Sequence, residues 1–178
     1  PKPVGEAGGG LGNALQGTLL MVGLGSLIGV PVGVSAGVYL SEFSRARFTN
    51  TLRTSVELLA GVPSIVLGIF AYAVIVVPMG GFSALAGSVA LAIILVPTVA
   101  KTTEEVLKLV PDHIREAGLA LGLPRWKVIL MIIVWGSRSG IMTGIMLAVA
   151  RISGETAPLI FTALNSQYWA HGILKPIS

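Results

Sequence analysis

Arg151 and Glu155 lie four positions apart in a segment that is otherwise uncharged from about residue 139 to residue 161. At that spacing the two side chains can face each other on one side of a helix. A guanidinium suits transient binding of an oxyanion such as phosphate, because it presents planar, paired N–H donors. Glu155 would keep such a site from holding the anion too tightly, and Thr156 follows it directly. The alternative is a mutually neutralising pair that only positions helices.

A second polar cluster follows another apolar segment, at Lys101, Thr102, Thr103 and Glu104. Lys101 and Glu104 are three positions apart and can pair along a helix, while the two threonines offer hydroxyl donors. We predict that both clusters contribute to an anion pathway. The alternative for this second cluster is an interfacial pair whose lysine extends from apolar surroundings toward water.

Residues for enzymatic chemistry are scarce in this chain. It has no cysteine and two isolated histidines, so it offers neither a thiolate nucleophile nor a histidine-rich metal site. It also lacks the G-x-x-x-x-G-K-[ST] pattern of a nucleotide-binding loop. We therefore predict that the chain is not an enzyme and that it binds no cofactor or metal itself.

The composition predicts an integral membrane protein. Hydrophobic residues make up 53% of the chain and charged residues 11%, against about 25% charged residues in soluble domains. A soluble protein of this composition would expose large apolar patches, which soluble monomers rarely do. A crossing helix needs about 20 apolar residues, so we expect a single all-α, polytopic helical bundle. The predicted spans are residues 13–40, 57–77, 83–103 and 139–161.

Glycine and proline indicate how these spans pack. Glycines recur every fourth residue from Gly25 to Gly37, and Gly140 and Gly144 repeat the spacing in the last span. Such a stripe lets a second helix backbone approach closely. Pro63 and a second proline, Pro97, lie inside predicted spans and are expected to kink them.

The basic residues predict the orientation in the membrane. Nine of them fall on one side of a four-span topology, against two on the other. The richer side is expected to be cytoplasmic. Those nine are Arg45, Arg47, Arg53, Lys101, Lys108, Arg115, Arg125, Lys127 and Arg138, and the two are Lys2 and Lys175.

The predicted cytoplasmic connection, residues 104–138, contains a short helix between Pro111 and Pro124. Asp112 is a favourable N-cap type, and Gly122 suits the left-handed position after a helix. Ile114, Ala117, Gly118 and Leu121 share one face at 100° per residue. That face could be seated in a groove of another protein, or it could rest on the bilayer.

The run Glu116-Ala117-Gly118, with Gly122 four positions after Gly118, resembles the EAA loop of ABC importer permeases. That loop reads E-A-A-x-x-x-G and continues further on with I-x-L-P. Ile132 stands at the expected isoleucine, whereas Val134-Trp135 replaces Leu-Pro. The resemblance implies the permease core of a type I ABC importer.

Within that superfamily the chain resembles the PstA family of phosphate permease subunits, from about Gly8 to Ile177. The matching segments are Lys101–Glu104, Leu109–Asp112, Ser139–Gly144 and Ala150–Pro158. The resemblance implies a multi-pass subunit of the prokaryotic plasma (inner) membrane. It also implies one additional span at each end of this core, so we expect the chain to be part of a longer subunit.

The resemblance further implies the partners. The short helix of the EAA-like loop would dock on a PstB-like ATPase dimer, which binds the ATP and Mg. A PstC-like permease would complete the translocation path through the membrane, and a PstS-like protein would deliver phosphate. The expected ATPase-coupling residues are Glu116, Ala117, Gly118, Leu121 and Gly122. Contacts with membrane lipid are expected and contacts with nucleic acid are not.

Other functions fit the residues as well. Two internal cations indicate an anion without saying which, so a sulfate or molybdate permease is an alternative, as is the sister phosphate permease PstC. A non-transporting membrane assembly subunit is the alternative from a different class.

Overall fold

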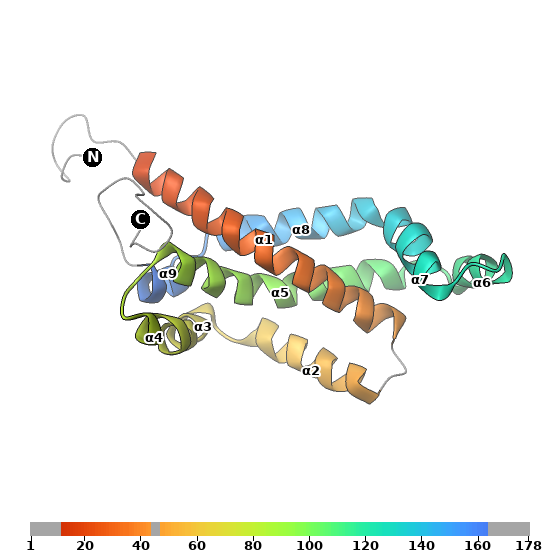
Figure 1. Ribbon diagram of the computed structural model, residues 1–178, viewed down its shortest axis with the longest axis horizontal. Coiled ribbons are helices and arrows are strands. Elements are labelled where there is room, and N and C mark those ends of the chain that lie inside the picture. The colour runs from red at the N-terminus through yellow and green to blue at the C-terminus, as the bar shows by residue number, and fades with distance from the viewer. Residues whose placement is uncertain (1–11, 44–46, 164–178) are drawn as a thin grey trace. The chain divides into compact units, whose positions relative to one another are not determined.

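The computed structural model describes residues 12–43 and 47–163, and every regular element in these ranges is helical (Figure 1). The chain divides into two compact units. Unit 1 comprises residues 1–29, 61–95 and 149–178, and unit 2 comprises residues 30–60 and 96–148. Arg45, Lys2 and Lys175, three of the residues behind the predicted orientation, lie outside the described residues.

The helices, in chain order, are α1 (Gly12–Glu42), α2 (Arg47–Gly61), α3 (Ser64–Ala71), η1 (Tyr72–Val76), α4 (Val77–Met79), α5 (Ala84–Lys108), α6 (Asp112–Ala120), α7 (Arg125–Lys127), η2 (Val128–Val134), α8 (Arg138–Ser153) and α9 (Ala157–Thr162). The two η segments are π-helical. Of the described helices, α1 and α5 are each long and apolar enough to cross a membrane. Two further crossings are possible if α2 with α3–α4, and α7–η2 with α8, each count as one broken span.

The first and third predicted spans each lie within one helix. Residues 13–40 fall inside α1, and α5 holds nearly all of residues 83–103 and continues to Lys108. Pro97 is accommodated within α5 without ending it. The start of the predicted connection, from residue 104, is therefore the last turn of α5 rather than a loop.

Residues 57–77, predicted as one span kinked at Pro63, are divided between helices on either side of that proline. α2 runs from Arg47 to Gly61, the chain leaves helical structure at Val62-Pro63, and α3 begins at Ser64. Pro63 has no N–H to continue the ladder, and its ring disfavours helical geometry at the residue before it. Glu57, the first residue of that predicted span, lies exposed inside α2.

The fourth predicted span, residues 139–161, is also interrupted. α8 ends at Ser153, and α9 restarts at Ala157 with a proline in its first turn. Pro158 has no N–H to donate to the carbonyl of residue 154, so a continuous helix would lose a hydrogen bond here. The chain instead ends α8 and begins α9 with the proline in the first turn, where no such hydrogen bond is needed. At the other end, the helix Arg125–Val134 precedes α8 at a bend of 69°, inside the stretch that was expected to be a connection.

The glycine stripe of α1 brings it into close contact with α5 in each unit, as the spacing predicts. In unit 1, a Cβ at Gly25 would lie 2.9 Å from the Ser88 carbonyl oxygen. In unit 2, where α1 and α5 lie side by side (Figure 1), a Cβ at Gly37 would lie 2.6 Å from the Ala100 carbonyl oxygen and 2.6 Å from Thr103 Cβ. Only a residue without a side chain fits at that distance.

We therefore expect Gly37→Ala to destabilise the folded chain by about 1–3 kcal/mol, as overpacking of a close contact does. Gly23→Ala is the matched control, because it lies in the same helix with nothing within 4 Å of the added Cβ, and it should be neutral or slightly stabilising. Unfolding of both variants in detergent by denaturant titration gives the comparison. Equal stability of the two variants would contradict the close α1–α5 contact.

Candidate functional site

The short helix α6 in unit 2 is fixed to the rest of its unit by Arg115. The Arg115 side chain donates to the Glu42 carboxylate at the end of α1, with Nη2 2.9 Å from Oε1. It also donates to the carbonyl oxygens of Leu107 at 2.9 Å and Val110 at 2.5 Å, near the end of α5. The Arg115 side chain is 20% exposed and that of Glu42 is 6% exposed. One arginine thus ties α6 to the ends of two long helices.

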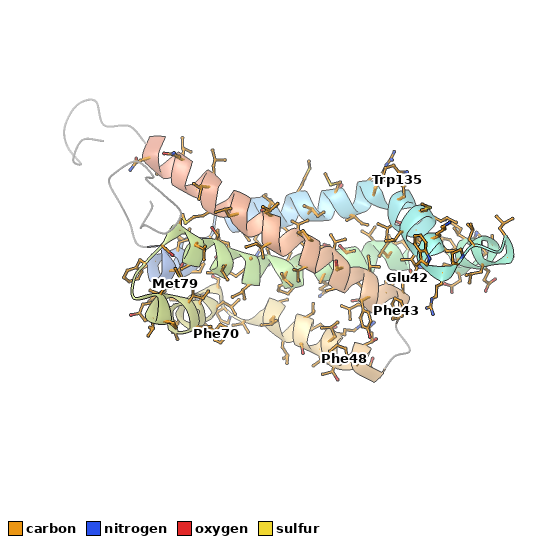
Figure 2. The ribbon with its side chains drawn as sticks, viewed as in Figure 1. Glu42, Phe43, Phe48, Phe70, Met79 and Trp135 are labelled. Atoms are coloured by element: carbon orange, nitrogen blue, oxygen red, sulfur yellow. The ribbon has the colours of Figure 1, made fainter. Side chains whose placement is uncertain are left out.

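A second arginine binds the same end of α1. Arg125 Nη2 donates to the Glu42 carbonyl oxygen at 2.7 Å, and its guanidinium lies 4.9 Å from the centre of the Phe43 ring. Figure 2 labels Glu42 and Phe43 at this end of α1, beside the α6–α7 region. Sequence reasoning missed Glu42 and Arg115 as a pair. The available signal was that Glu42 is the first acidic residue after a run of 35 uncharged ones, a position that requires a partner.

Only part of the predicted docking face of α6 is available to another protein. Gly118 is buried, and a Cβ there would lie 3.0 Å from side-chain atoms of Val128 and Ile132 in η2. Ile114 packs on the same apolar cluster of unit 2. The expectation that these two residues face a partner together with Ala117 and Leu121 is therefore wrong. The small size of Gly118 serves the close packing of α6 on η2.

The other residues predicted to couple to an ATPase are exposed. Glu116 and Ala117 are exposed, and the exposed fraction of Leu121 is 80%. Gly122 has φ of +79°, which confirms the left-handed position predicted after the helix. A carboxylate, a small side chain and a leucine are thus presented on a helix that its own unit holds in place.

Asp112 does not cap α6. The capping position is Pro111, Asp112 is the first helical residue, and its side chain makes no capping hydrogen bond. Its carboxylate instead accepts a 3.3 Å hydrogen bond from Arg115 Nη1 and is 90% exposed. Its charge at the first turn still interacts favourably with the helix dipole.

The predicted pair between Lys101 and Glu104 is not formed. Glu104 Oε1 lies 2.8 Å from Arg53 Nη2 and 2.6 Å from Lys108 Nζ, and the Glu104 side chain is 8% exposed. Arg53 reaches it from α2 and also donates to the Leu40 carbonyl oxygen at 3.3 Å. Lys108 lies one turn further along α5, at the spacing of four that favours an acid before a base. Lys101 is exposed.

The two threonines of this cluster have different surroundings. Thr102 Oγ1 donates to the Thr98 carbonyl oxygen at 3.0 Å, and the side chain packs against Gly144 of α8 in unit 2. Thr103 is buried, and its hydroxyl makes no hydrogen bond within the described residues. Of the two, Thr103 is the hydroxyl with unused hydrogen-bonding capacity.

In unit 1, Arg151 and Glu155 lie close but are not locked together. Arg151 is in the last turn of α8, whereas Glu155 lies in the non-helical connection before α9. Arg151 Nε and Glu155 Oε1 are 4.0 Å apart, and the side chains are 55% and 17% exposed. The i, i+4 spacing therefore brings them together without a continuous helix. The guanidinium keeps donors for another anion.

The connection that carries Glu155 and Thr156 leads into α9, which is fixed within unit 1. A Cβ at Gly68 of α3 would lie 2.6 Å from Pro158 Cα, so the start of α9 rests directly on the α3 backbone. At the other end of α9, the Ser83 N–H donates to the Thr162 carbonyl oxygen at 3.1 Å. Glu155 thus precedes a helix that is held at both ends.

Comparison with known proteins identifies relatives over nearly the whole chain. The phosphate transport system permease proteins PstA of Yersinia pestis and Haemophilus influenzae are 48% and 50% identical over 99% and 96% of this chain. The probable phosphate transport system permease protein PstA of Methanocaldococcus jannaschii is 44% identical over 87%. These matches confirm the resemblance to PstA. The chain spans about 60% of the length of the first two relatives and 55% of the third.

The fold is shared with a solved structure. A chain of the MetNI methionine ABC transporter, solved in inward-facing conformations, superposes on this chain with a TM-score of 0.70 at 22% identity. The superposition covers 84% of this chain and 71% of that chain. This similarity confirms the predicted all-α fold. A family model described as binding-protein-dependent transport system inner membrane component matches residues 29–174. The chain therefore belongs to the binding-protein-dependent transport system inner membrane component family.

Proposed function

We propose that this chain forms the core of the permease subunit of an ATP-driven phosphate importer. The observation that carries the coupling role is the anchored helix α6, which Arg115 ties to α1 and α5 while Glu116, Ala117 and Leu121 stay exposed. A helix fixed in this way can transmit a displacement by a partner directly to two long helices. Phosphate is the proposed substrate because the curated relatives are named as phosphate permeases.

In this proposal α6 meets a PstB-like ATPase dimer, which binds ATP and Mg and hydrolyses ATP. A PstC-like permease completes the path and a PstS-like protein delivers phosphate. The nine-to-two distribution of basic residues supports a cytoplasmic position for α6, in the plasma (inner) membrane of a prokaryote. Gly118 and Gly122 would act by shaping α6 rather than by touching the ATPase.

The proposed anion pathway uses one cation in each unit. Arg151 offers free guanidinium donors near Glu155 and Thr156 in unit 1. In unit 2, Lys101 is exposed and Thr103 has an unused hydroxyl, while Thr102 is bonded within α5. Glu104 is neutralised by Arg53 and Lys108, so we assign it to holding this cluster in place rather than to contact with the anion.

We expect Arg151→Gln to lower the rate of phosphate uptake about tenfold or more, since the loss of one charge-assisted anion contact corresponds to roughly 1.5–3 kcal/mol. Uptake of labelled phosphate is measured in vesicles that contain the full-length subunit assembled with its partners. Arg151→Lys is the matched variant, because it keeps the charge and loses the planar fork, and it should retain intermediate activity. Copurification of all subunits confirms assembly of each variant. Undiminished uptake by an intact Arg151→Gln complex would contradict the assignment of the pathway.

The same vesicles separate phosphate from the other oxyanions. A phosphate importer should continue to take up labelled phosphate in excess sulfate or molybdate. Uptake of sulfate or molybdate with no phosphate uptake would favour the alternative permease. A complete assembly that moves none of the three anions would support a non-transporting assembly subunit.

A further inference from the structure

Three basic residues of unit 2 each lie over an aromatic ring, and none of the three has a carboxylate partner within the described residues. Arg125 lies 4.9 Å from the centre of the Phe43 ring, Lys127 lies 5.5 Å from that of Trp126, and Arg138 lies 4.6 Å from that of Trp135. Arg53, Lys108 and Arg115 of the same unit all bind carboxylates. The three residues over rings therefore keep their positive charge available for another partner.

The three rings are themselves exposed. The exposed fractions are 39% for Phe43, 57% for Trp126 and 65% for Trp135. Figure 2 shows Phe43 and Trp135 toward the same end of unit 2, where α6 and α7 stand. Aromatic rings with a polar or charged neighbour are typical of the headgroup level of a bilayer.

The helix α7–η2, which carries Arg125, Trp126 and Lys127, has apolar side chains on two sides. Val128, Ile129 and Ile133 are buried within the protein. On the outward side, Leu130 and Met131 are 53% and 63% exposed, between the basic residues of this region. A helix with apolar outward side chains and flanking Lys and Arg is suited to lie in the membrane interface.

The direction of this helix agrees with that position. α7–η2 meets α8 at a bend of 69°, so the two parts of this broken span cannot both run along the membrane normal. We place α7–η2 as the part that runs closer to the membrane plane. Its exposed leucine and methionine would then reach the boundary between headgroups and acyl chains. Lys127 and Arg138, near its two ends, would lie among the headgroups.

We infer that Phe43, Trp126 and Trp135, together with Arg125, Lys127 and Arg138, form an aromatic–basic surface that binds the phosphate headgroups of anionic lipids. A lipid satisfies both parts of this surface at once, because its phosphate pairs with the cations and its glycerol and acyl region covers the rings and Leu130. A free phosphate ion would leave the exposed apolar side chains uncovered. This inference is independent of which anion the importer carries.

The test compares two charge-matched variants of the full-length subunit in its assembled complex. Lys127→Gln/Arg138→Gln removes two charges of the surface, and neither side chain makes a hydrogen bond or ion pair within the described residues. Lys2→Gln/Lys175→Gln removes two charges from the side that the sequence predicts to be opposite. Each purified complex is supplied with equal amounts of phosphatidylglycerol and phosphatidylcholine, and the retained lipids are counted by native mass spectrometry.

We expect the wild type and the Lys2/Lys175 variant to retain phosphatidylglycerol preferentially. The Lys127/Arg138 variant should lose about 25-fold in that preference, since each of the two interfacial cations contributes roughly fivefold. Inorganic phosphate at millimolar concentration should not displace the lipid. Equal lipid preference in all three complexes would overturn the inference. Displacement of the bound lipid by inorganic phosphate would also overturn it, because it would show that the charges bind a free anion. Loss of the ATPase subunit with unchanged lipid retention would assign the surface to a protein contact and overturn it too.

Discussion

If the chain is the permease core of a phosphate importer, as proposed above, replacing Arg115 by glutamine is expected to reduce phosphate-stimulated ATP hydrolysis and phosphate uptake at least tenfold in the assembled complex. The change removes the donors to Glu42, Leu107 and Val110 together, and it leaves a carboxylate that is 6% exposed without its cation. Removing one partner of a buried ion pair costs about 3–5 kcal/mol. Because the Arg115–Glu42 pair lies near helix ends, we expect its cost to be toward the lower value. Without this tie, displacement of α6 would no longer move the ends of α1 and α5.

The ATPase rate and the uptake rate, measured on the same preparation, check this expectation. Asp112→Asn is the matched control, because it removes an acid that also contacts Arg115 but is 90% exposed, and it should change either rate by less than about twofold. If Arg115→Gln retained normal coupling in an intact complex, the anchoring of α6 would have no part in transmission.

Replacing Glu104 by alanine is expected to have a similarly large effect, here on stability. Its carboxylate is 8% exposed and accepts from both Arg53 and Lys108. After the change the Arg53 guanidinium, 28% exposed, keeps only the 3.3 Å bond to the Leu40 carbonyl. We expect a loss of about 3 kcal/mol, at the lower end for breaking a buried pair, because Lys108 is half exposed and remains solvated.

Denaturant unfolding in detergent, with the yield of assembled complex, measures this loss. Glu105→Ala is the matched control, since Glu105 is the exposed neighbour on the same helix and should alter stability by less than about 0.5 kcal/mol. Equal stability of the Glu104 and Glu105 variants would mean that the three-residue ion cluster does not hold α2 against α5.

Backbone geometry and hydrophobicity could be predicted from the sequence because both act locally. The low charge content indicated a membrane protein, which membership of the family confirms. The four-residue glycine spacing predicted close helix contact, which Gly37 makes. The left-handed backbone at Gly122 was predictable from the residue type at a helix end.

The interruptions of the helices were only partly predictable. Pro63 and Pro97 both lie within apolar runs, yet the first ends a helix and the second is accommodated inside α5. The difference depends on whether neighbouring helices supply enough packing to hold a helix together across a missing hydrogen bond. No pattern within either run carries that information.

The sequence by itself determined the class of protein, the family resemblance and the presence of a short helix with glycine after it. Only the tertiary structure decided which charges pair. Glu104 pairs with Arg53 and Lys108, and Glu42 pairs with Arg115. Arg115 and Glu42 are 73 positions apart, and Arg53 and Glu104 are 51 apart. Partners at such separations are set by which helix faces meet, and the close packing of the whole unit sets those faces rather than any local spacing.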